Sequence, residues 1–322
     1  AHVKTLGTDK PAFLWAHYFD AHAPYAPPEA HLTAAGGRPY LGEVAFADSQ
    51  MGRLITAFKA AAAGAGREAA VVVTSDHGEG LGDHGEAQHG NLVYQSTMHV
   101  PLAMSGPGVP TGEEDTPVST RRIFHTIMDW AGQSSADSLR APELTSEVVL
   151  GEAMKPHLQY GWQPQIMAVE GSQKAILAGP TEVYDLDTDP KETTDLKTVA
   201  TLPASIRTAM DEYPVPSLAA PSSAPSALDA DAKQKLASLG YVGATTTPTV
   251  RKDAPRPVDM AHLFPVIDEA SGLFVQQRYS QVIPLLQKIL TSDPNHLDAT
   301  MRLATAHSAL GQDHQALAAC KR

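Results

Sequence analysis

The chain has 322 residues, and its 24 lysines and arginines against 36 aspartates and glutamates give a formal net charge of −12. This balance excludes nucleic acid and anionic membranes as main partners, because both repel an acidic protein. A hydrophobic content of 43% is ordinary for a globular protein. No apolar run approaches the ~20 residues of a membrane span, and the single cysteine, Cys320, excludes an intrachain disulfide. Residue 1 is alanine and no signal peptide is visible, so we expect the chain to open inside a larger protein.

The first half of the chain alternates predicted strands and helices. Apolar runs at 12–16, 69–74 and 100–104 predict three strands. Apolar residues at helical spacing predict helices at 44–63 and 120–131. This alternation favours an α/β fold with a mostly parallel sheet and flanking helices.

The second half predicts a different organisation. Three short strands between 165 and 187, separated by Gly-Ser and Gly-Pro, predict a small antiparallel sheet. Pro-, Ser-, Ala- and Thr-rich stretches at 214–226 and 244–257 are typical of linkers. We therefore divide the chain into an α/β domain (1–212), a linker region (213–260) and a C-terminal domain (261–322).

The C-terminal domain contains a repeat with a period of 34 residues. At that spacing Ala270 matches Ala304 and Gln281 matches Gln315, and Pro294 falls between the two units. This period is the signature of the tetratricopeptide helix–turn–helix, although an ordinary helical hairpin is the alternative. Since at least three units normally build such a solenoid, we expect the repeats to be truncated at Arg322.

The most informative stretch is 74–90, which reads TSDHGEGLGDHGEAQHG and follows the predicted strand 69–74. It holds three histidines, four carboxylates and five glycines. Ligands bind at the carboxyl ends of strands in α/β sheets. A carboxylate next to an imidazole, as in Asp76-His77, suits a divalent metal ion, whereas an isolated pair of this kind more often caps a helix. We place Glu79 in the first turn of a following helix.

These residues, read with several other segments, resemble the sulfatase branch of the alkaline phosphatase superfamily, which also includes phosphonate and phosphodiester hydrolases. The resemblance covers about residues 10–243. It implies a partial alkaline-phosphatase-like sandwich before the repeats. The segments that carry it are TSDHGE with GDHG at 74–85, FLWAHYFDAHAPY at 13–25, HVPL at 99–102, VYDL at 183–186 with DPKE at 189–192, and LASLGYVG at 236–243.

The resemblance also implies roles for individual residues. Asp76 and His77 match metal ligands, and His22 matches a histidine that hydrogen-bonds the sulfate or phosphate group. His89 stands where the family commonly has a lysine that contacts the substrate oxygens. Because histidine is half neutral near pH ~6.5, oxyanion binding would weaken as the pH rises through the pKa of His89.

Three further residues are weaker candidates for roles around the site. His17 and Asp20 lie beside His22 in the sequence and would orient it, or would form a structural hydrogen bond at a strand end. His84, with Asp83, would stabilise the loop rather than bind the metal.

The family's nucleophile motif is absent from the sequence. Sulfatases use a formylglycine made from the Cys or Ser of a C/S-x-P-x-R motif, and no such motif occurs here. The family's first metal carboxylates are also missing, and both lie upstream of residue 1 in family order. We therefore expect a C-terminal fragment of a sulfate ester hydrolase, without turnover by itself. The alternatives are a phosphonate or phosphodiester hydrolase and a non-catalytic interaction module that binds through its repeats.

The resemblance suggests a cofactor, partners and a location. Calcium is the family's usual metal, and an imidazole ligand also admits manganese, iron or zinc. The substrate would be a small sulfate ester, and the repeats would offer a surface to a protein partner. The expected location is periplasmic or secreted.

Overall fold

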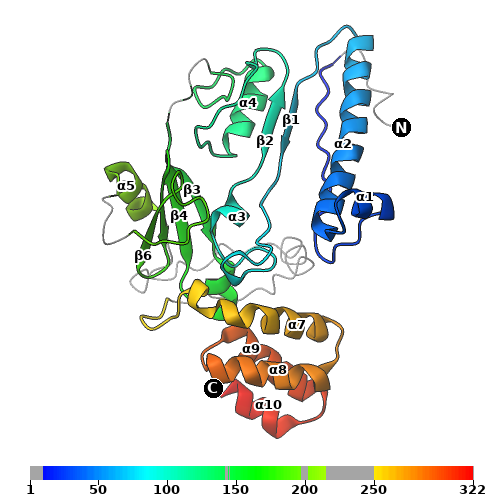
Figure 1. Cartoon of the computed structure of the whole chain (residues 1–322). Coiled ribbons are helices and arrows are strands. Elements are labelled where there is room, and N and C mark those ends of the chain that lie inside the picture. The colour runs from blue at the N-terminus through cyan, green and yellow to red at the C-terminus, as the bar shows by residue number, and fades with distance from the viewer. Residues whose placement is uncertain (1–9, 142–143, 145, 197–201, 215–249, 322) are drawn as a thin grey trace. The chain divides into compact units, whose positions relative to one another are not determined.

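The computed structural model describes residues 10–141, 144, 146–196, 202–214 and 250–321. The chain forms two compact units (Figure 1). Unit 1 comprises residues 1–75, 101–114 and 120–144, and unit 2 comprises residues 76–100, 115–119 and 145–322. Most of the predicted linker, including LASLGYVG at 236–243, lies outside the described residues.

Unit 1 contains helices and a two-stranded sheet. The predicted helices at 44–63 and 120–131 and the predicted strands at 69–74 and 100–104 are confirmed, with boundaries shifted by a few residues. The long helix begins with Pro39, and proline suits this position because the first N–H of a helix has no acceptor within the helix. Gly66, just beyond the end of the helix, has a φ of 66°. The elements are α1 (Glu29–Ala34), α2 (Pro39–Gly64), β1 (Val71–Thr74), β2 (Leu102–Ser105) and α4 (Arg122–Trp130).

Two expectations for this region are wrong. Strands β1 and β2 pair antiparallel, with Val71 opposite Ser105, rather than as parallel strands of a larger sheet. The segment between them reverses the chain and provides no crossover helix, which a parallel pair needs. Residues 12–16 form no strand, and Phe13 and Trp15 are 69% and 78% exposed. An apolar run becomes a strand only where a neighbouring strand pairs with its backbone. Among the described residues, no strand pairs with residues 12–16.

Unit 2 contains the predicted antiparallel sheet, extended by one strand. The strands follow one another in the order β3-β4-β5-β6, and a two-residue turn joins Glu170 to Gln173. Gly171 in that turn has a φ of 58°, which glycine adopts without strain. The strands are β3 (Val149–Ala153), β4 (Gln165–Glu170), β5 (Gln173–Leu177) and β6 (Thr181–Asp185).

Each face of this sheet packs against a different layer. Ala168 and Ala175 contact Ile206 and Met210 of helix α5 (Ala204–Glu212). The alternate residues of the same strands face the larger core of the unit, since successive side chains of a strand point to opposite faces. That core takes in Met167, Val169, Ile176 and Tyr184.

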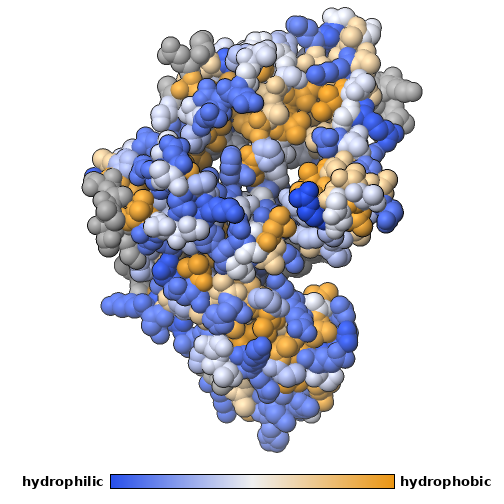
Figure 2. Space-filling model, viewed as in Figure 1, coloured by the Kyte–Doolittle hydropathy of each residue, from blue (hydrophilic) through white to orange (hydrophobic). Residues whose placement is uncertain are grey.

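The C-terminal helices form the repeat block. Helix α9 is the repeat of α7, and its first residue lies 33 positions after that of α7 (264 to 297). Helix α10 is the repeat of α8, and its first residue lies 34 positions after that of α8 (279 to 313). Pro294 lies in the turn between α8 and α9, as the repeat pattern predicted. These helices are α7 (Phe264–Val275), α8 (Tyr279–Ser292), α9 (Leu297–Ala309) and α10 (Asp313–Cys320), preceded by the 3₁₀ segment η4 (Pro257–Leu263). Figure 2 shows hydrophobic residues on the surface of this block. Met301 of α9 and Leu317 of α10 are 62% and 54% exposed.

One hydrophobic core joins the sheet to the repeats. It includes Ile176 of the sheet, Trp162 before β4, and Leu286, Ile289 and Leu303 of the repeat helices. The repeat block is therefore packed into unit 2 as part of its fold. In the described part of the chain, no helix combines the length and the apolar character needed to cross a bilayer.

Candidate metal and anion site

The loop that follows β1 is closed by its own backbone and by the segment after it. Gly78 N–H donates to Thr97 O at 2.8 Å, Gly80 N–H to Gln88 O at 2.7 Å, and Gly82 N–H to Glu86 O at 2.8 Å. A Cβ on Gly78 would lie 2.2 Å from Ser96 O, so no larger residue fits there. Gly80 is under the same constraint, with Glu86 O at 2.3 Å. The glycines of the sequence motif therefore serve close backbone approach. We call residues 76–92, which include the candidate metal ligands Asp76 and His77, the metal loop.

Asp76 and His77 begin the metal loop, and their geometry suits a shared cation. His77 Nδ1 lies 2.8 Å from Gly78 O, so Nδ1–H donates to this carbonyl and Nε2 is the ring nitrogen that would bind a metal. Nε2 is 3.8 Å from Asp76 Oδ2. Two ligand atoms at that separation can bind one ion at the usual ~2.0–2.6 Å each. Both side chains reach solvent, at 40% and 74% exposure for His77 and Asp76.

His89 lies against His77 and is held from behind by a carboxylate. The two imidazole rings stack with centroids 3.8 Å apart. His89 Nδ1 is 3.3 Å from Glu79 Oε1, and the Glu79 side chain is only 3% exposed. The expectation that Glu79 begins a helix is wrong, because the only helical turn in the loop is the 3₁₀ segment η2 (Asp83–Gly85). Glu79 instead fixes the orientation of the His89 ring.

A second buried carboxylate closes the base of the metal loop. Glu86, 2% exposed, accepts hydrogen bonds from Asn91 N–H at 2.7 Å and Leu92 N–H at 3.1 Å. Burial raises the pKa of Glu86 to about 7, against the lowering effect of these bonds. Glu86 thus ties the end of the loop that carries His89 to the backbone of Asn91 and Leu92.

The donor set fits a divalent cation in part. Asp76 and His77 would supply one carboxylate oxygen and one imidazole nitrogen, whereas calcium takes six to eight oxygens. Within the described ranges, no group of three or more histidine, cysteine, aspartate or glutamate side chains could hold a metal ion. A metal bound at this pair therefore needs further ligands, from water or from other groups.

His22 lies in unit 1, in a loop held by a buried carboxylate. Glu43 of α2, 7% exposed, accepts hydrogen bonds from Ala21 N–H at 2.9 Å and Ala26 N–H at 2.7 Å. The His22 ring stacks on Phe19 with centroids 4.7 Å apart, and its Nδ1 lies 2.7 Å from Ala23 O. His17 and Asp20 are both exposed. Their expected orienting role stays a prediction.

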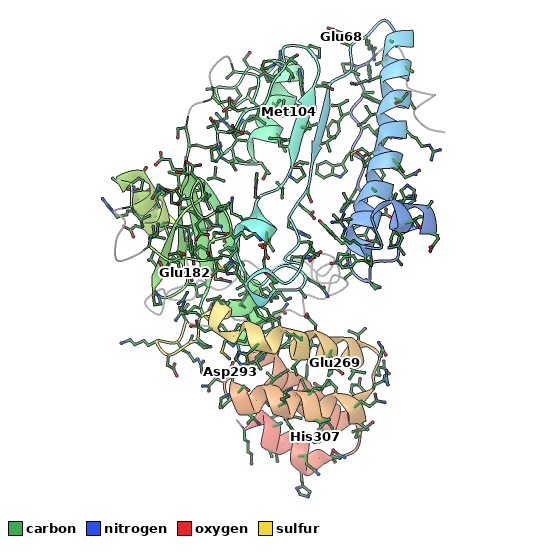
Figure 3. The ribbon with its side chains drawn as sticks, in the orientation of Figure 1. Glu68, Met104, Glu182, Glu269, Asp293 and His307 are labelled. Carbon is green, nitrogen blue, oxygen red and sulfur yellow. The ribbon has the colours of Figure 1, made fainter. Side chains whose placement is uncertain are left out.

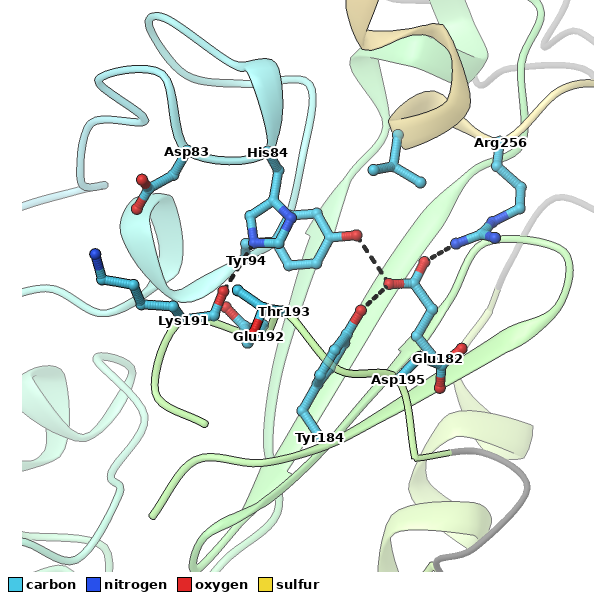
Figure 4. A pocket seen from close by; sticks show the side chains of 11 residues that line it. Asp83, His84, Tyr94, Glu182, Tyr184, Lys191, Glu192, Thr193, Asp195 and Arg256 are labelled. Carbon is cyan, nitrogen blue, oxygen red and sulfur yellow. Dashed lines mark hydrogen bonds and ion pairs between the residues drawn. The ribbon is translucent and has the colours of Figure 1, made fainter. Parts of the chain in front are cut away.

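His84 belongs to a polar cavity of about 470 Å³ in unit 2 (Figure 4). Its ring stacks on Tyr94 with centroids 3.5 Å apart, and its Nε2 lies 3.0 Å from Lys191 O. This arrangement agrees with a loop-stabilising role. Asp83, which lines the same cavity, is exposed.

The centre of the cavity is Glu182 on β6, which is buried at 3% exposure. Its carboxylate accepts hydrogen bonds from Tyr94 Oη at 2.8 Å and Tyr184 Oη at 2.5 Å, and it pairs with Arg256 (Figure 4). Burial, with the neighbouring carboxylate, raises the pKa of both tyrosines well above the usual range. The network joins the segment after the metal loop to the sheet and to the chain entering η4.

The sequence did not reveal Glu79, Glu86 or Glu182 as part of these arrangements. Glu79 and Glu86 lie inside the metal loop, but a carboxylate in a glycine-rich loop is usually solvated. Glu182 lies in a predicted strand, and no sequence pattern marks any of the three as a buried partner.

Comparisons with known proteins agree with the loop and the repeats. Residues 3–133 match the family described as Sulfatase, and residues 273–322 match the family described as Tetratricopeptide repeat. The chain therefore joins, in one polypeptide, a region that matches the Sulfatase family and a region that matches the Tetratricopeptide repeat family.

Individual relatives are sulfatases of greater length. The chain is 27% identical over 169 residues to choline-sulfatase of Rhizobium meliloti, covering 49% of this chain and 32% of that protein. It is 31% identical over 106 residues to arylsulfatase K of Danio rerio, covering 33% of this chain and 20% of that protein. The chain thus spans about a third or less of these relatives.

Solved structures of two hydrolases also align with the chain. A phosphonate monoester hydrolase of Agrobacterium radiobacter shares 27% identity with a TM-score of 0.42, covering 56% of this chain and 40% of that one. A putative sulfatase from Bacteroides thetaiotaomicron shares 24% identity with a TM-score of 0.44, covering 56% and 42%.

Proposed function

We propose that the complete protein hydrolyses sulfate esters with a divalent metal ion, and that the metal loop of this chain supplies part of the site. One observation carries the proposal: Asp76 Oδ2 and His77 Nε2 lie 3.8 Å apart at the end of β1, with the imidazole oriented by Gly78 O. The sulfatase match over 3–133 includes both residues. The names of the two relatives, choline-sulfatase and arylsulfatase K, support sulfate rather than another ester as the substrate class.

Each candidate residue of the chain would have its own role in the reaction. Asp76 and His77 would hold the metal, which when bound supplies positive charge that stabilises the anionic group as it is transferred. His89, oriented by Glu79 through Nδ1, would direct Nε2 towards the oxygens of that group. The family resemblance gives His22 of unit 1 a hydrogen bond to a sulfate or phosphate group, and that role stays a prediction. Calcium is the metal we propose, with manganese, iron and zinc as the other candidates.

Metal binding by the purified chain tests the metal pair. Isothermal titration with calcium and with manganese should give saturable binding that Asp76→Asn weakens at least tenfold, about 1.4 kcal/mol or more. Asp83→Asn is the matched control, because Asp83 is an exposed carboxylate of the same loop, and it should leave the affinity within about twofold. Equal effects of the two substitutions, or no binding to the wild-type chain, would contradict the assignment.

Substrate class is tested separately in the complete protein. A nitrophenyl sulfate should be hydrolysed in preference to the corresponding phosphate diester and phenylphosphonate, and chelation of the metal should abolish turnover. Preference for the phosphonate or the diester would assign the protein to the other hydrolases of the superfamily. Absence of turnover on all three, with protein partners bound at the repeats, would favour the interaction module.

A further inference from the structure

The segment from Pro156 to Trp162 lies between the metal loop and the repeat block. Trp162 has no exposed surface, and its Nε1 donates to Asp293 Oδ2 at 2.7 Å. Asp293 lies at the end of α8 (Figure 3). Its ring packs edge-on against His296, with centroids 5.5 Å apart. Trp162 therefore fixes this segment to the turn between α8 and α9.

Tyr160, two residues earlier, contacts both the repeat block and the metal loop. It is 2% exposed, and its ring lies 4.8 Å from that of His296, the N-cap of α9. Its hydroxyl donates to Asn91 Oδ1 at 3.3 Å. Gly161 between the two aromatic residues allows a close approach, since a Cβ there would lie 3.1 Å from Leu297 Cγ. One side chain thus connects α9 to the metal loop.

Asn91 is the point where this contact meets the loop. Its backbone N–H donates to Glu86 Oε1 at 2.7 Å, and its carbonyl accepts from Gln165 Nε2. It follows His89 by two residues. The position of Asn91 therefore decides where the His89 end of the loop lies.

Two more contacts link the repeat side to the same loop. A Cβ on Gly85 of η2 would lie 3.0 Å from the Cβ of Ala261 in η4. Arg256, just before η4, pairs with Glu182, which also accepts the Tyr94 hydroxyl. The chain entering the repeats thus contacts the metal loop and the segment that follows it.

We propose that the repeat block is a positioning element for the metal loop. Through Tyr160, the position of α9 determines the position of Asn91 and therefore that of His89. The positioning is a matter of contacts within unit 2. The claim that it serves sulfate ester hydrolysis rests on the proposed function. By linkage, any ligand that shifts the start of α9 also changes affinity at the loop.

Hydrogen exchange of the chain by nuclear magnetic resonance tests this positioning without a substrate. Tyr160→Phe removes only the hydroxyl that contacts Asn91. It should accelerate exchange of the Gly82 and Leu92 amides, which bond within the loop, by about three- to tenfold. The amides of Ala175 and Ile176 in the sheet should exchange at the wild-type rate.

The matched control is Tyr279→Phe, a tyrosine of α8 whose ring packs on Phe274 within the repeats. It should leave the loop amides unchanged. An unchanged loop in Tyr160→Phe would overturn the proposal. Equal acceleration in loop and sheet would also overturn it, because that result marks a general loss of stability.

A second variant approaches the loop from the repeat side. His296→Asn keeps an acceptor for Ala299 N–H at the start of α9 but removes the ring that packs on Tyr160. It should accelerate the same loop amides, and wild-type rates there would overturn the proposal even if Tyr160→Phe did not fold. Metal titration of these variants separates the two proposals. Failure of the wild-type chain to bind metal contradicts the proposed function, whereas the exchange result stands independently.

Discussion

The two units of this protein bury their side chains in opposite ways. Among the described residues, every buried hydrophobic side chain belongs to unit 2. Unit 1 buries polar groups instead, including Glu43, Arg122 and Thr126, while Phe13 and Trp15 are exposed. Unit 2 closes its core by packing repeat helices on a sheet, and each layer covers the apolar face of the other. An apolar pattern thus leads to burial only where a second layer is present.

The sharpest contrast between the units is in their ion pairs. Lys174 and Glu192 of unit 2 are 2.5 Å apart with side chains 0% and 1% exposed, whereas Arg121 and Asp137 of unit 1 are 55% and 43% exposed. Lys174→Met should destabilise the protein by about 4 kcal/mol, because it leaves Glu192 buried without its cation. Arg121→Met should cost less than about 0.5 kcal/mol. Urea denaturation followed by circular dichroism measures both, and similar losses would remove the contrast.

Two isoleucines on helices provide the next comparison. Ile289 of α8 is 1% exposed within the core of unit 2, whereas Ile55 of α2 is half-buried. Ile289→Ala should reduce the free energy of unfolding by about 3 kcal/mol, from lost burial and the cavity left behind. Ile55→Ala should reduce it by less than about 1 kcal/mol. A cost for Ile55→Ala as large as that for Ile289→Ala would show that α2 is covered in solution.

The smallest expected effect is a pH dependence confined to unit 2. Burial lowers the pKa of His296 to about 4, against an ordinary 6.5. Below pH 6.5 His296 is protonated in the unfolded chain but stays neutral in the folded protein, so the free energy of unfolding decreases as the pH falls towards 4. From pH 7 to pH 5 the loss should be about 2 kcal/mol.

The control for this pH effect is His296→Asn, whose stability should lack that part of the decline. Glu86 acts in the opposite direction, because its raised pKa favours the protonated form in the fold. The measured quantity is therefore the difference between the two pH profiles, from thermal melts between pH 7 and pH 5. Parallel profiles would show that His296 titrates normally.

Much of the organisation could be predicted from the sequence. The helix at 44–63, the three strands between 165 and 187 and the 34-residue repeat depend on local spacing of apolar residues, which reflects the period of each element. The α/β class with a small antiparallel sheet and C-terminal helical repeats is confirmed. The antiparallel pairing of β1 and β2 was missed, since local pattern does not encode which way two distant strands run.

The metal loop shows the same division. Its residue types indicated a carboxylate–imidazole pair at Asp76-His77, and the family resemblance of the surrounding motif assigned that pair to a metal and added His89. Only the tertiary structure showed that Glu79 orients His89, that Glu86 closes the loop, and that Tyr160 ties it to the repeats. The Tyr160 contact joins residues 69 positions apart in the sequence. The sequence therefore determined which chemical groups the loop carries and which helices repeat, and packing between distant segments decided how those groups are held, because such contacts form only when the chain has folded.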